Sequence, residues 1–526
     1  DEADVKSALA ELADRFAGPL EFGTAGLRGA LGAGPNRMNR VVVIRAAAGL
    51  GAYLRAHGGD SVVIGYDARH NSDVFARDTA AVLTAAGLQA MVLPRPLPTP
   101  VLAFAIRHLG ADAGVMVTAS HNPPQDNGYK VYLGDGCQII PPTDAEISAE
   151  IDAVGPLASV PRAEDGWVTV DDADVTEPYL ARVAALARPQ SPRQLRVVYT
   201  PLHGVGGAVL PAVLQRAGYP PPVVVATQAE PDPDFPTVAF PNPEEPGALD
   251  LAFDTARQAD ADLVVANDPD ADRVAIGVPD STSAGGWRML RGDEVGSLLG
   301  SYLIERGVPE GSVFANSIVS SSQLGRIVRA AGYTHVETLT GFKWIGRIPH
   351  LAFGYEEALG YCVDPSAVGD KDGVSAGLMV VELAATARAR GQSLLDLLDE
   401  LARVYGLHAT DQVSVRVEDR RMIDQAIDRL RAHPPVSLGG RAVQVADDLS
   451  MGVDGLPPTP GLRYRLDGGA RVIIRPSGTE PKLKTYLEVI EPVNDGDVAR
   501  ARAQAGRALD ALRADVIAQL GLQQPA

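Results

Sequence analysis

The sequence predicts an α/β protein in which three similar domains with mixed α/β sheets precede a C-terminal α+β domain. Two observations support this fold class. A unit of strand, loop and helix recurs three times along the 526 residues, and the pattern changes near Thr410 to Val-rich strands and a long helix. Because a domain typically has roughly 150 residues, a chain of this length is also expected to form three or four domains. We therefore expect several domains, each with its own core.

The repeated unit begins with a β-branched strand, passes through a loop of small residues and ends its helix with Ala-Gly. Its copies span residues 62–88, 197–219 and 313–333. Glycine is the usual residue after a helix, and the order strand, helix, strand calls for parallel strands joined by right-handed crossovers. Because repetition indicates duplicated structural units, we expect three sheets of similar topology.

Each copy continues into a further apolar segment that ends in a polar loop. The three loops begin near Ser120, Asp268 and Glu356. In open α/β sheets, ligands collect beyond the carboxyl ends of the strands. One repeat therefore offers a hydroxyl group, the next a set of carboxylates and the third a pair of glutamates. A duplicated fold with unrelated surface loops is the alternative.

The last part of the chain, from about Thr410, changes character. Val413–Val417 and Val472–Ile474 are predicted strands, and residues 497–520 form a long Ala- and Arg-rich helix. These elements indicate a fourth, α+β domain.

The net charge of −19 excludes nucleic-acid binding as the main function, because the average field repels a phosphate backbone. An anionic small substrate would need a local group of Arg, Lys and backbone N–H groups.

With only Cys137 and Cys362 available, neither a disulfide framework nor a thiolate zinc site can form. The absence of any run of about 18 apolar residues predicts no membrane segment. The polar, acidic start of the chain is unlike a secretory signal, so we expect a cytoplasmic protein.

Ser120 lies in a polar segment, Thr118–Pro124, that is followed by Asn127–Lys130. Such a serine can act as a nucleophile if its neighbours take its proton or stabilise negative charge. A simple Ser/Asn/Pro turn is the alternative. No G-x-S-x-G pattern surrounds Ser120, which argues against an acyl-transfer hydrolase.

The segment Asp268–Arg273 alternates aspartates with uncharged residues, so several oxygen atoms can converge on one hard cation. Magnesium fits best, and the adjacent arginine suits a phosphoryl group that bridges both. An EF-hand is excluded, because its sixth position would be Arg273 and its twelfth Pro279. The alternative is a solvated acidic turn.

Two further loops have the composition of anion sites. Arg475–Lys482 combines hydroxyl groups, a glycine and two flanking cations, as backbone anion nests do, although a turn between strands is equally consistent. Phe22–Gly29 is rich in glycine and contains Arg28, but it lacks the spacing of a nucleotide P-loop.

Four motifs together resemble those of the α-D-phosphohexomutase superfamily, the phosphoglucomutases and phosphomannomutases, over essentially the whole chain. Thr118–Pro123 looks like the phosphoserine loop, and Asp268–Arg273 looks like the magnesium loop. Gly354–Gly360 looks like the sugar-recognition loop, and Arg475–Lys482 looks like the phosphate-binding loop. Their agreement in order makes chance an inadequate explanation.

The resemblance implies a four-domain, heart-shaped architecture around a central cleft. It places the phosphoserine loop in residues 1–188, the magnesium loop in 189–290, the sugar-recognition loop in 291–408 and the phosphate-binding loop in 409–526. It further implies that Ser120 is phosphorylated, and that one Mg²⁺ per chain is held by a phosphoryl oxygen with Asp268, Asp270 and Asp272.

The resemblance also implies the roles of the remaining site residues. Arg28, Lys130 and Arg273 would surround the phosphoserine, with Lys130 as the candidate for proton exchange with the sugar hydroxyl and Lys371 as a second candidate. The side chains expected to bind substrate are His121, Asn122, Lys343, Glu356, Glu357, Arg475, Ser477, Gly478, Thr479 and Lys482.

The implied activity interconverts hexose 1-phosphate and hexose 6-phosphate of glucose or mannose, through a hexose 1,6-bisphosphate that also activates the enzyme. The sugar loop departs from the usual pattern, because Ala358 stands where many members have serine. This variant resembles the branch that includes phosphopentomutase and glucose-1,6-bisphosphate synthase, so both stay as alternatives. A non-catalytic sugar-phosphate sensor and a phosphatase are hypotheses from other classes. The expected partner is a small phosphosugar, with no nucleic acid and no membrane.

Overall fold

The computed structural model describes residues 2–21, 26–417, 419–477 and 482–521. The chain divides into two compact units. One comprises residues 1–295 and 341–391, and the other comprises residues 296–340 and 392–526.

The first unit begins with helix α1 (Glu2–Arg15) and contains a six-stranded sheet with the order β1-β5-β4-β2-β3-β6. Its strands are β1 (Leu27–Ala30), β2 (Ser61–Tyr66), β3 (Gln89–Val92), β4 (Ala113–Val117), β5 (Asp126–Leu133) and β6 (Val168–Thr169). Strands β2, β3 and β4 are parallel, whereas β5 runs antiparallel to both β4 and β1.

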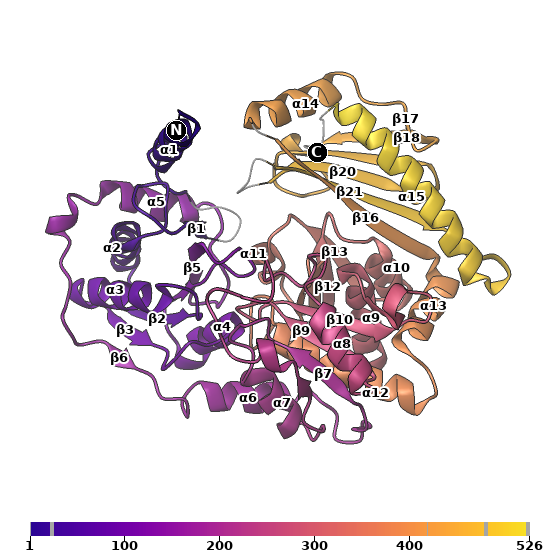
Figure 1. Ribbon diagram of the computed structural model, residues 1–526, viewed down its shortest axis with the longest axis horizontal. Coiled ribbons are helices and arrows are strands. Elements are labelled where there is room, and N and C mark those ends of the chain that lie inside the picture. Colours follow the sequence, from indigo (N-terminus) through magenta and orange to yellow (C-terminus); the bar gives the residue numbers. More distant parts are fainter. Residues whose placement is uncertain (1, 22–25, 418, 478–481, 522–526) are drawn as a thin grey trace. The chain divides into compact units, whose positions relative to one another are not determined.

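Helices cover both faces of this sheet (Figure 1). They are α2 (Arg40–Ala56), α3 (Ser72–Ala85), α4 (Thr99–Leu109) and α5 (Thr143–Ala153). On one face Val62 and Ile64 share a core with residues of α2 and α3. On the other face Gly114 leaves space that Ile106 of α4 fills. The alternation of side chains along β2 and β4 therefore builds a three-layer domain.

A second sheet in this unit has the order β11-β10-β9-β7-β8. Its strands are β7 (Val197–Thr200), β8 (Val223–Val224), β9 (Leu263–Asn267), β10 (Val274–Pro279) and β11 (Trp287–Met289). The accompanying helices are α6 (Thr176–Ala184), α7 (Val209–Arg216) and α8 (Asp250–Gln258). Strand β7 is parallel to β8 and β9, and β10 is antiparallel to β9, which repeats the topology of the first sheet.

The first unit ends with elements that follow residue 341. They are α11 (Phe342–Ile345), β14 (Leu351–Glu356), β15 (Gly360–Cys362) and α12 (Gly373–Ala389). Strands β14 and β15 form an antiparallel pair. Helix α12 is buried nearly all round and packs on α7 and β9, as its apolar composition requires.

The second unit contains β12 (Val313–Ser317) parallel to β13 (Thr334–Thr338), with α10 (Gln323–Ala330) between them. Helix α9 (Gly292–Arg306) begins in the first unit and continues into the second. Helix α13 (Leu394–Tyr405) begins with a capping box formed by Ser393 and Asp396, which satisfies two orphan N–H groups.

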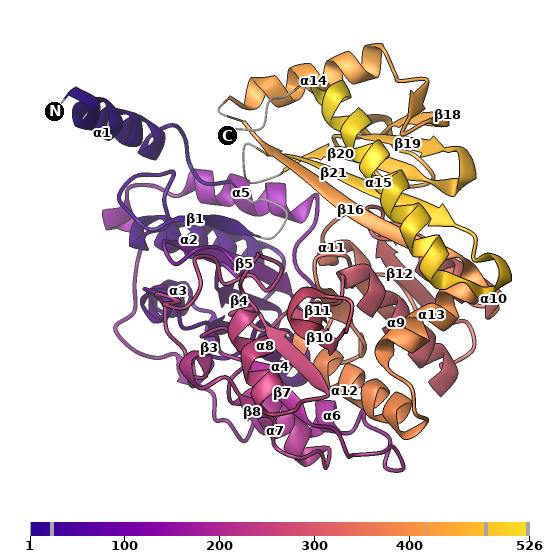
Figure 2. The same cartoon turned by 45° about the vertical axis from the view of Figure 1, so that its right-hand side comes forward.

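The C-terminal part of the second unit is an antiparallel sheet with the order β16-β21-β20-β19-β18-β17. Its elements are β16 (Leu407–Arg416), α14 (Arg420–Ala432), β17 (Ser437–Leu438), β18 (Arg441–Asp448), β19 (Leu462–Leu466), β20 (Arg471–Pro476), β21 (Lys482–Glu491) and α15 (Val498–Leu520). Helix α15 lies along β16 and β21 (Figures 1 and 2), where Leu512 and Val516 join the core.

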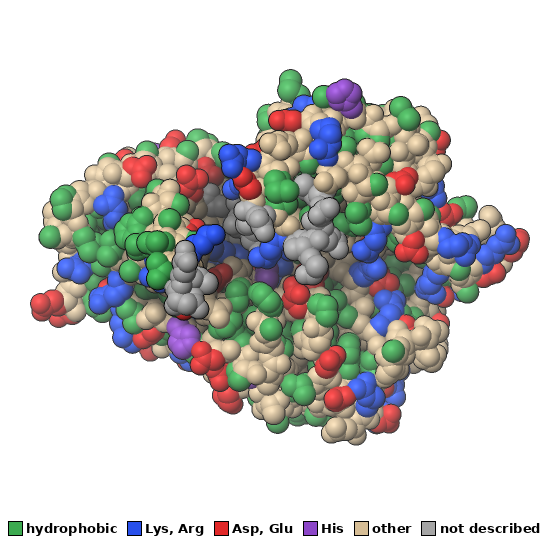
Figure 3. All heavy atoms as spheres, turned by 45° about the horizontal axis from the view of Figure 1, so that its top comes forward, with side chains coloured by type: hydrophobic (Ala, Val, Ile, Leu, Met, Phe, Trp, Pro, Cys, Tyr) green, Lys and Arg blue, Asp and Glu red, His purple; other side chains and the backbone are tan. Residues whose placement is uncertain are grey.

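The prediction of three mixed α/β sheets followed by an α+β domain is confirmed. The helix of each repeat ends before a glycine with positive φ, 83° at Gly87, 85° at Gly218 and 81° at Gly332. Each repeat also pairs its first two strands in parallel. Among the described residues no helix has both the length and the apolar composition to cross a membrane. Basic and acidic side chains are interspersed over the face shown in Figure 3.

Candidate active site

Ser120 lies just beyond the carboxyl end of β4 on a loop that the fold holds in an unusual conformation. Its φ is 51°, a left-handed value that is rare for a residue with a side chain and is typical of functional sites. The Ser120 N–H donates to the Thr118 hydroxyl at 2.9 Å, and Thr118 in turn donates to Asp67 at 2.6 Å. These buried contacts fix the backbone and leave the Ser120 hydroxyl free to point toward the second sheet.

The three aspartates predicted to bind metal follow β9 in the same way that Ser120 follows β4. The Ser120 hydroxyl donates to Asp268 Oδ2 at 2.7 Å, so the two loops meet although these residues are 148 positions apart in the sequence. Asp268, Asp270 and Asp272 are buried, and one carboxylate oxygen of each lies within 4.8 Å of the others. The fold therefore gathers a hydroxyl group and three carboxylates around one point.

The donor set at this point fits a hard cation. Oδ1 of Asp270 and Oδ1 of Asp272 are buried and have no hydrogen-bond partner among the described residues, although buried carboxylate oxygens are normally satisfied. Burial, together with the charges of Asp270 and Asp272, raises the pKa of Asp268 well above its usual range. A divalent ion would relieve this repulsion, and oxygen ligands of this kind are those that Mg²⁺ prefers.

Two lysines face these aspartates. Lys130, on β5, donates to Asp270 at 2.7 Å and to Asp272 at 3.0 Å, and it is buried. Burial acts to lower its pKa, but the two carboxylates outweigh that effect and raise it. The ammonium group of Lys371 lies 3.2 Å from Asp272 and 5.7 Å from the centre of the Phe342 ring.

Lys371 reaches this position because Gly360 lacks a side chain. A Cβ atom at Gly360 would lie 2.2 Å from Cδ of Lys371. Asp370 accepts hydrogen bonds from Tyr132 at 2.8 Å and from Gln138 at 2.6 Å, which fixes the segment that carries Lys371. Lys371 thus passes close to Gly360 of β15 and is the second cation beside the aspartates.

Arg28 and Arg273 add two more positive charges. Arg28 lies on β1, which pairs with β5, and its Nε has no hydrogen-bond partner among the described residues. Nε of Arg273 lies 3.7 Å from Asp272 Oδ1 and 4.0 Å from Asp268 Oδ2. Four cations with hydrogen-bonding capacity therefore lie in the same part of the first unit as the serine and the carboxylates, as a phosphoryl group would require.

The predicted sugar loop lies against the metal loop. Arg273 donates to the Ala358 carbonyl at 3.0 Å, and the Val274 N–H donates to the Leu359 carbonyl at 3.1 Å. Glu356 ends β14 and accepts a hydrogen bond from the Gly341 N–H at 2.7 Å. Burial is the main cause of its raised pKa, and the charge of Lys371 opposes that shift.

The remaining predicted site residues of the first unit differ in their contacts and in their burial. His121 Nδ1 lies 3.3 Å from the Ser120 hydroxyl. Asn122 donates to Asp126 at 2.9 Å, within its own loop. Lys343 lies on α11 and is partly buried, which lowers its pKa. Glu357 is also partly exposed, directly after β14.

The predicted phosphate-binding loop belongs to the second unit. Arg475 lies on β20, and Lys482 begins β21. The Ser477 N–H donates to the Lys482 carbonyl at 2.8 Å, so these two residues close the connection between the strands. Gly478 and Thr479 lie outside the described residues.

Sequence reasoning missed several residues that shape the site. Thr99, at the start of α4, donates its hydroxyl to Asp270 at 2.7 Å and its N–H to the Asp270 carbonyl at 2.9 Å. Asp67 and Arg69 follow β2 and contact the serine loop. The signal for Asp67 and Arg69 was present, because they too lie beyond the carboxyl end of a parallel strand. No local pattern marks Thr99.

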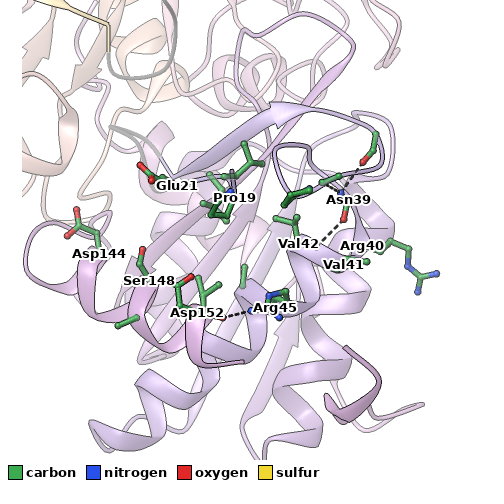
Figure 4. A pocket seen from close by; sticks show the side chains of 18 of the residues that line it. Pro19, Glu21, Asn39, Arg40, Val41, Val42, Arg45, Asp144, Ser148 and Asp152 are labelled. Carbon is green, nitrogen blue, oxygen red and sulfur yellow. Dashed lines mark hydrogen bonds between the residues drawn. The ribbon is translucent and has the colours of Figure 1, made fainter. Parts of the chain in front are cut away.

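A cavity in the first unit lies away from these residues. Its volume is about 1150 Å³, and its walls come from the segment after α1, from the start of α2 and from α5 (Figure 4). None of the predicted catalytic or metal-binding residues lines it.

Comparison with known families matches the chain along most of its length. The family "Phosphoglucomutase/phosphomannomutase" matches with its alpha/beta/alpha domain I at residues 19–156, domain II at 177–281, domain III at 291–405 and C-terminal domain at 413–509. The chain belongs to this family. It is accordingly an isomerase of the intramolecular phosphotransferase class, and the resemblance to the α-D-phosphohexomutase superfamily is confirmed.

Individual relatives agree with this assignment. A Haemophilus influenzae protein named "Probable phosphomannomutase" is 47% identical over 86% of this chain and 93% of its own length. The human phosphopentomutase is 34% identical over 95% of this chain and 90% of its own length. A crystal structure of a phosphoglucomutase/phosphomannomutase family protein from Burkholderia thailandensis is 22% identical, covers 96% of this chain and 99% of that one, and has a TM-score of 0.73, which shows the shared fold.

Proposed function

We propose that this mutase interconverts hexose 1-phosphate and hexose 6-phosphate of glucose, mannose or both, through phosphorylated Ser120. The observation that carries the proposal is the 2.7 Å hydrogen bond from the Ser120 hydroxyl to Asp268, because it sets a nucleophile directly against a triad of buried carboxylates. We also propose four domains, with the bounds 1–188, 189–290, 291–408 and 409–526. The cytoplasmic location of the protein stays a prediction.

In the proposed reaction, the phosphoryl group leaves the Ser120 oxygen for a hydroxyl of the bound sugar monophosphate. The ammonium group of Lys130 or, as a second candidate, Lys371 would exchange protons in this step, giving one to the departing Ser120 oxygen as it takes one from the sugar hydroxyl. The resulting hexose 1,6-bisphosphate turns over within the site. The Ser120 hydroxyl then attacks the other phosphate, and its proton passes by the same exchange to the sugar oxygen that is released. Phosphoryl transfer asks the protein mainly for positioning and charge neutralisation, which Arg28, Arg273 and the two lysines supply.

Asp268, Asp270 and Asp272, together with an oxygen of the phosphorylated Ser120, would hold one Mg²⁺ per chain. Bound there, the ion neutralises charge on the transferring phosphoryl group. The buried, unpartnered oxygens of Asp270 and Asp272 support this assignment. Hexose 1,6-bisphosphate would serve as activator, since it restores the phosphate on Ser120.

Within the first unit, Glu356 and Glu357 are proposed to hold sugar hydroxyls, because a carboxylate can accept from two adjacent hydroxyl groups. His121, Asn122 and Lys343 are the other proposed substrate contacts of that unit. In the second unit, Arg475, Ser477 and Lys482 are proposed to bind the phosphate that does not react, together with Gly478 and Thr479.

A panel of glucose, mannose and ribose 1-phosphates, assayed with Mg²⁺ and catalytic hexose 1,6-bisphosphate, tests the substrate. Ala358 offers no hydroxyl, so selectivity at the second carbon of the sugar should be loose. We expect glucose and mannose 1-phosphates to differ by less than ~100-fold in kcat/KM, the range that one contact can supply. Glu356→Gln should lower both values in parallel, whereas Glu177→Gln, at a surface pair with Arg216, should lower neither.

Other results of this panel would favour the alternatives. Faster turnover of ribose 1-phosphate than of either hexose would indicate a phosphopentomutase, a name that the human relative carries. Net accumulation of the bisphosphate would indicate a synthase. Release of inorganic phosphate would indicate a phosphatase, and binding without turnover would indicate a sensor.

Arg475→Ala tests the phosphate-binding role, and it should chiefly raise KM. Loss of a charge-assisted contact costs on the order of 2 kcal/mol, which corresponds to about a thirtyfold change. Steady-state kinetics with each active substrate would measure the effect. Arg465→Ala, an exposed arginine on β19 that contacts Asp447, is the matched control. An unchanged KM for every substrate would reduce the loop to a simple turn.

A further inference from the structure

Arg69 is a buried arginine that sits beneath the serine loop and contacts mainly its backbone. It follows β2 and is 4% exposed. Its Nη2 donates to the Ser120 carbonyl at 2.6 Å and to the Asn122 carbonyl at 2.5 Å. Its Nη1 donates to the Pro123 carbonyl at 2.8 Å and to the Asp126 carbonyl at 3.2 Å. One guanidinium group therefore gathers four carbonyl groups from seven consecutive residues, 120–126.

The position of Arg69 is itself fixed from two sides. Its backbone N–H donates to Asp67 Oδ1 at 3.0 Å, and its Nε lies 3.4 Å from Asp67 Oδ2. The Phe235 ring, from the second sheet's domain, packs on the guanidinium with its centre 5.0 Å from Cζ. A planar group held by a carboxylate and an aromatic face has few orientations available to it.

These contacts stabilise the unfavourable backbone conformation of Ser120. A left-handed φ at a residue with a side chain costs free energy and persists only where its surroundings impose it. The Ser120 N–H is held through Thr118, and the Ser120 carbonyl is held by Arg69. Both peptide groups that flank Ser120 are thus anchored to residues that also contact Asp67, which leaves the hydroxyl aimed at Asp268.

We propose that Arg69 is a positioning residue for the nucleophile: it clamps the serine loop by its carbonyl groups and thereby sets the direction of the Ser120 hydroxyl. The inference rests on the proposed phosphoserine chemistry and adds a residue that does not touch the substrate. Lysine cannot replace it, because one ammonium group cannot reach four carbonyls in a planar fork.

Arg69→Lys and Arg69→Met test the clamp. Both should lower kcat by about 10²-fold with KM changed less than threefold, since a misplacement of about 1 Å can cost that much. The rate at which glucose 1,6-bisphosphate transfers phosphate to Ser120, followed by intact mass, should fall by the same factor. Arg40→Lys is the matched control, because Arg40 makes a similar forked pair with Asp78, away from the serine loop, and both rates should stay near wild type.

Phe235→Leu provides a milder variant that keeps the arginine and removes the ring beneath it. It should slow the phosphorylation of Ser120 several-fold, in step with kcat, while circular dichroism shows a folded protein. If the Arg69 variants and Phe235→Leu lower only the melting temperature, and the folded fraction takes up phosphate at the wild-type rate, Arg69 is merely structural and the proposal is wrong. A wild-type protein that neither turns over nor accepts phosphate on Ser120 would instead overturn the proposed function, and the clamp with it.

Discussion

Ser120→Ala should lower kcat by at least ~10³-fold while sugar-phosphate binding stays measurable, because the variant loses the nucleophile and keeps the binding residues. The loop itself should survive the change. The Ser120 N–H still donates to Thr118, and the Ser120 carbonyl still accepts from Arg69. The hydrogen bonds that disappear are those of the hydroxyl with Asp268 and with His121 Nδ1.

Two measurements separate a lost nucleophile from a damaged fold. Intact mass should show one phosphate on the wild type and none on Ser120→Ala after incubation with hexose 1,6-bisphosphate. Ser297→Ala, which removes another buried hydroxyl on α9, should keep both the phosphate and the wild-type rate. Substantial turnover by phosphate-free, chelated Ser120→Ala protein would contradict the role of Ser120.

The recurrence of strands in the sequence predicts both the fold and much of the site for one physical reason. Each β-branched run that ends in a polar loop places that loop at the carboxyl edge of a sheet. Ser120 after β4 and Asp268 after β9 follow this rule, and the structure brings them within hydrogen-bonding distance. The glycines after the repeated helices follow an equally local rule, since their left-handed φ is needed to end the helix.

Residues that act through tertiary contacts escape this kind of reasoning. Thr99 contacts Asp270 because α4 of the first sheet's domain begins against the metal loop that follows β9, and no sequence pattern near Thr99 predicts that packing. Lys371 can extend to the aspartates only because Gly360, eleven positions earlier, has no side chain in its path. Arg69 does lie beyond the carboxyl end of a strand, as site residues do, but only its four carbonyl contacts show that it holds the serine loop.

The charge balance of the site is also a property of the fold. Isolated buried carboxylates are costly, so three of them within one small volume require cations or protons close by. Lys130 and Lys371 contact Asp270 and Asp272, whereas Asp268 faces Arg273 at 4.0 Å and the Ser120 hydroxyl at 2.7 Å. The carboxylate with the weakest cationic contact is thus the one that touches the nucleophile. A metal ion bound beside Ser120 would complete this balance.

Asp270→Asn and Asp272→Asn should therefore each lower kcat on the order of 10³-fold and change KM little, since a bound ion would supply several kcal/mol of charge stabilisation at the transferring group. Such an ion would act at the transferring group and would leave the binding of the other phosphate to other residues, so KM should change little. Each variant should also need more Mg²⁺ for half-maximal activity. Titration of Mn²⁺, followed by electron paramagnetic resonance, should show weaker binding without any turnover.

Asp364→Asn provides the matched control for this last prediction. Asp364 is a half-buried carboxylate of the same unit that forms a forked ion pair with Arg182. Its loss should lower the melting temperature and leave the dependence on Mg²⁺ at the wild-type value. Asn retains the shape of Asp but carries no charge, so an Asp270 or Asp272 variant that reaches the full rate in chelator would show that these carboxylates serve the buried lysines rather than a metal ion.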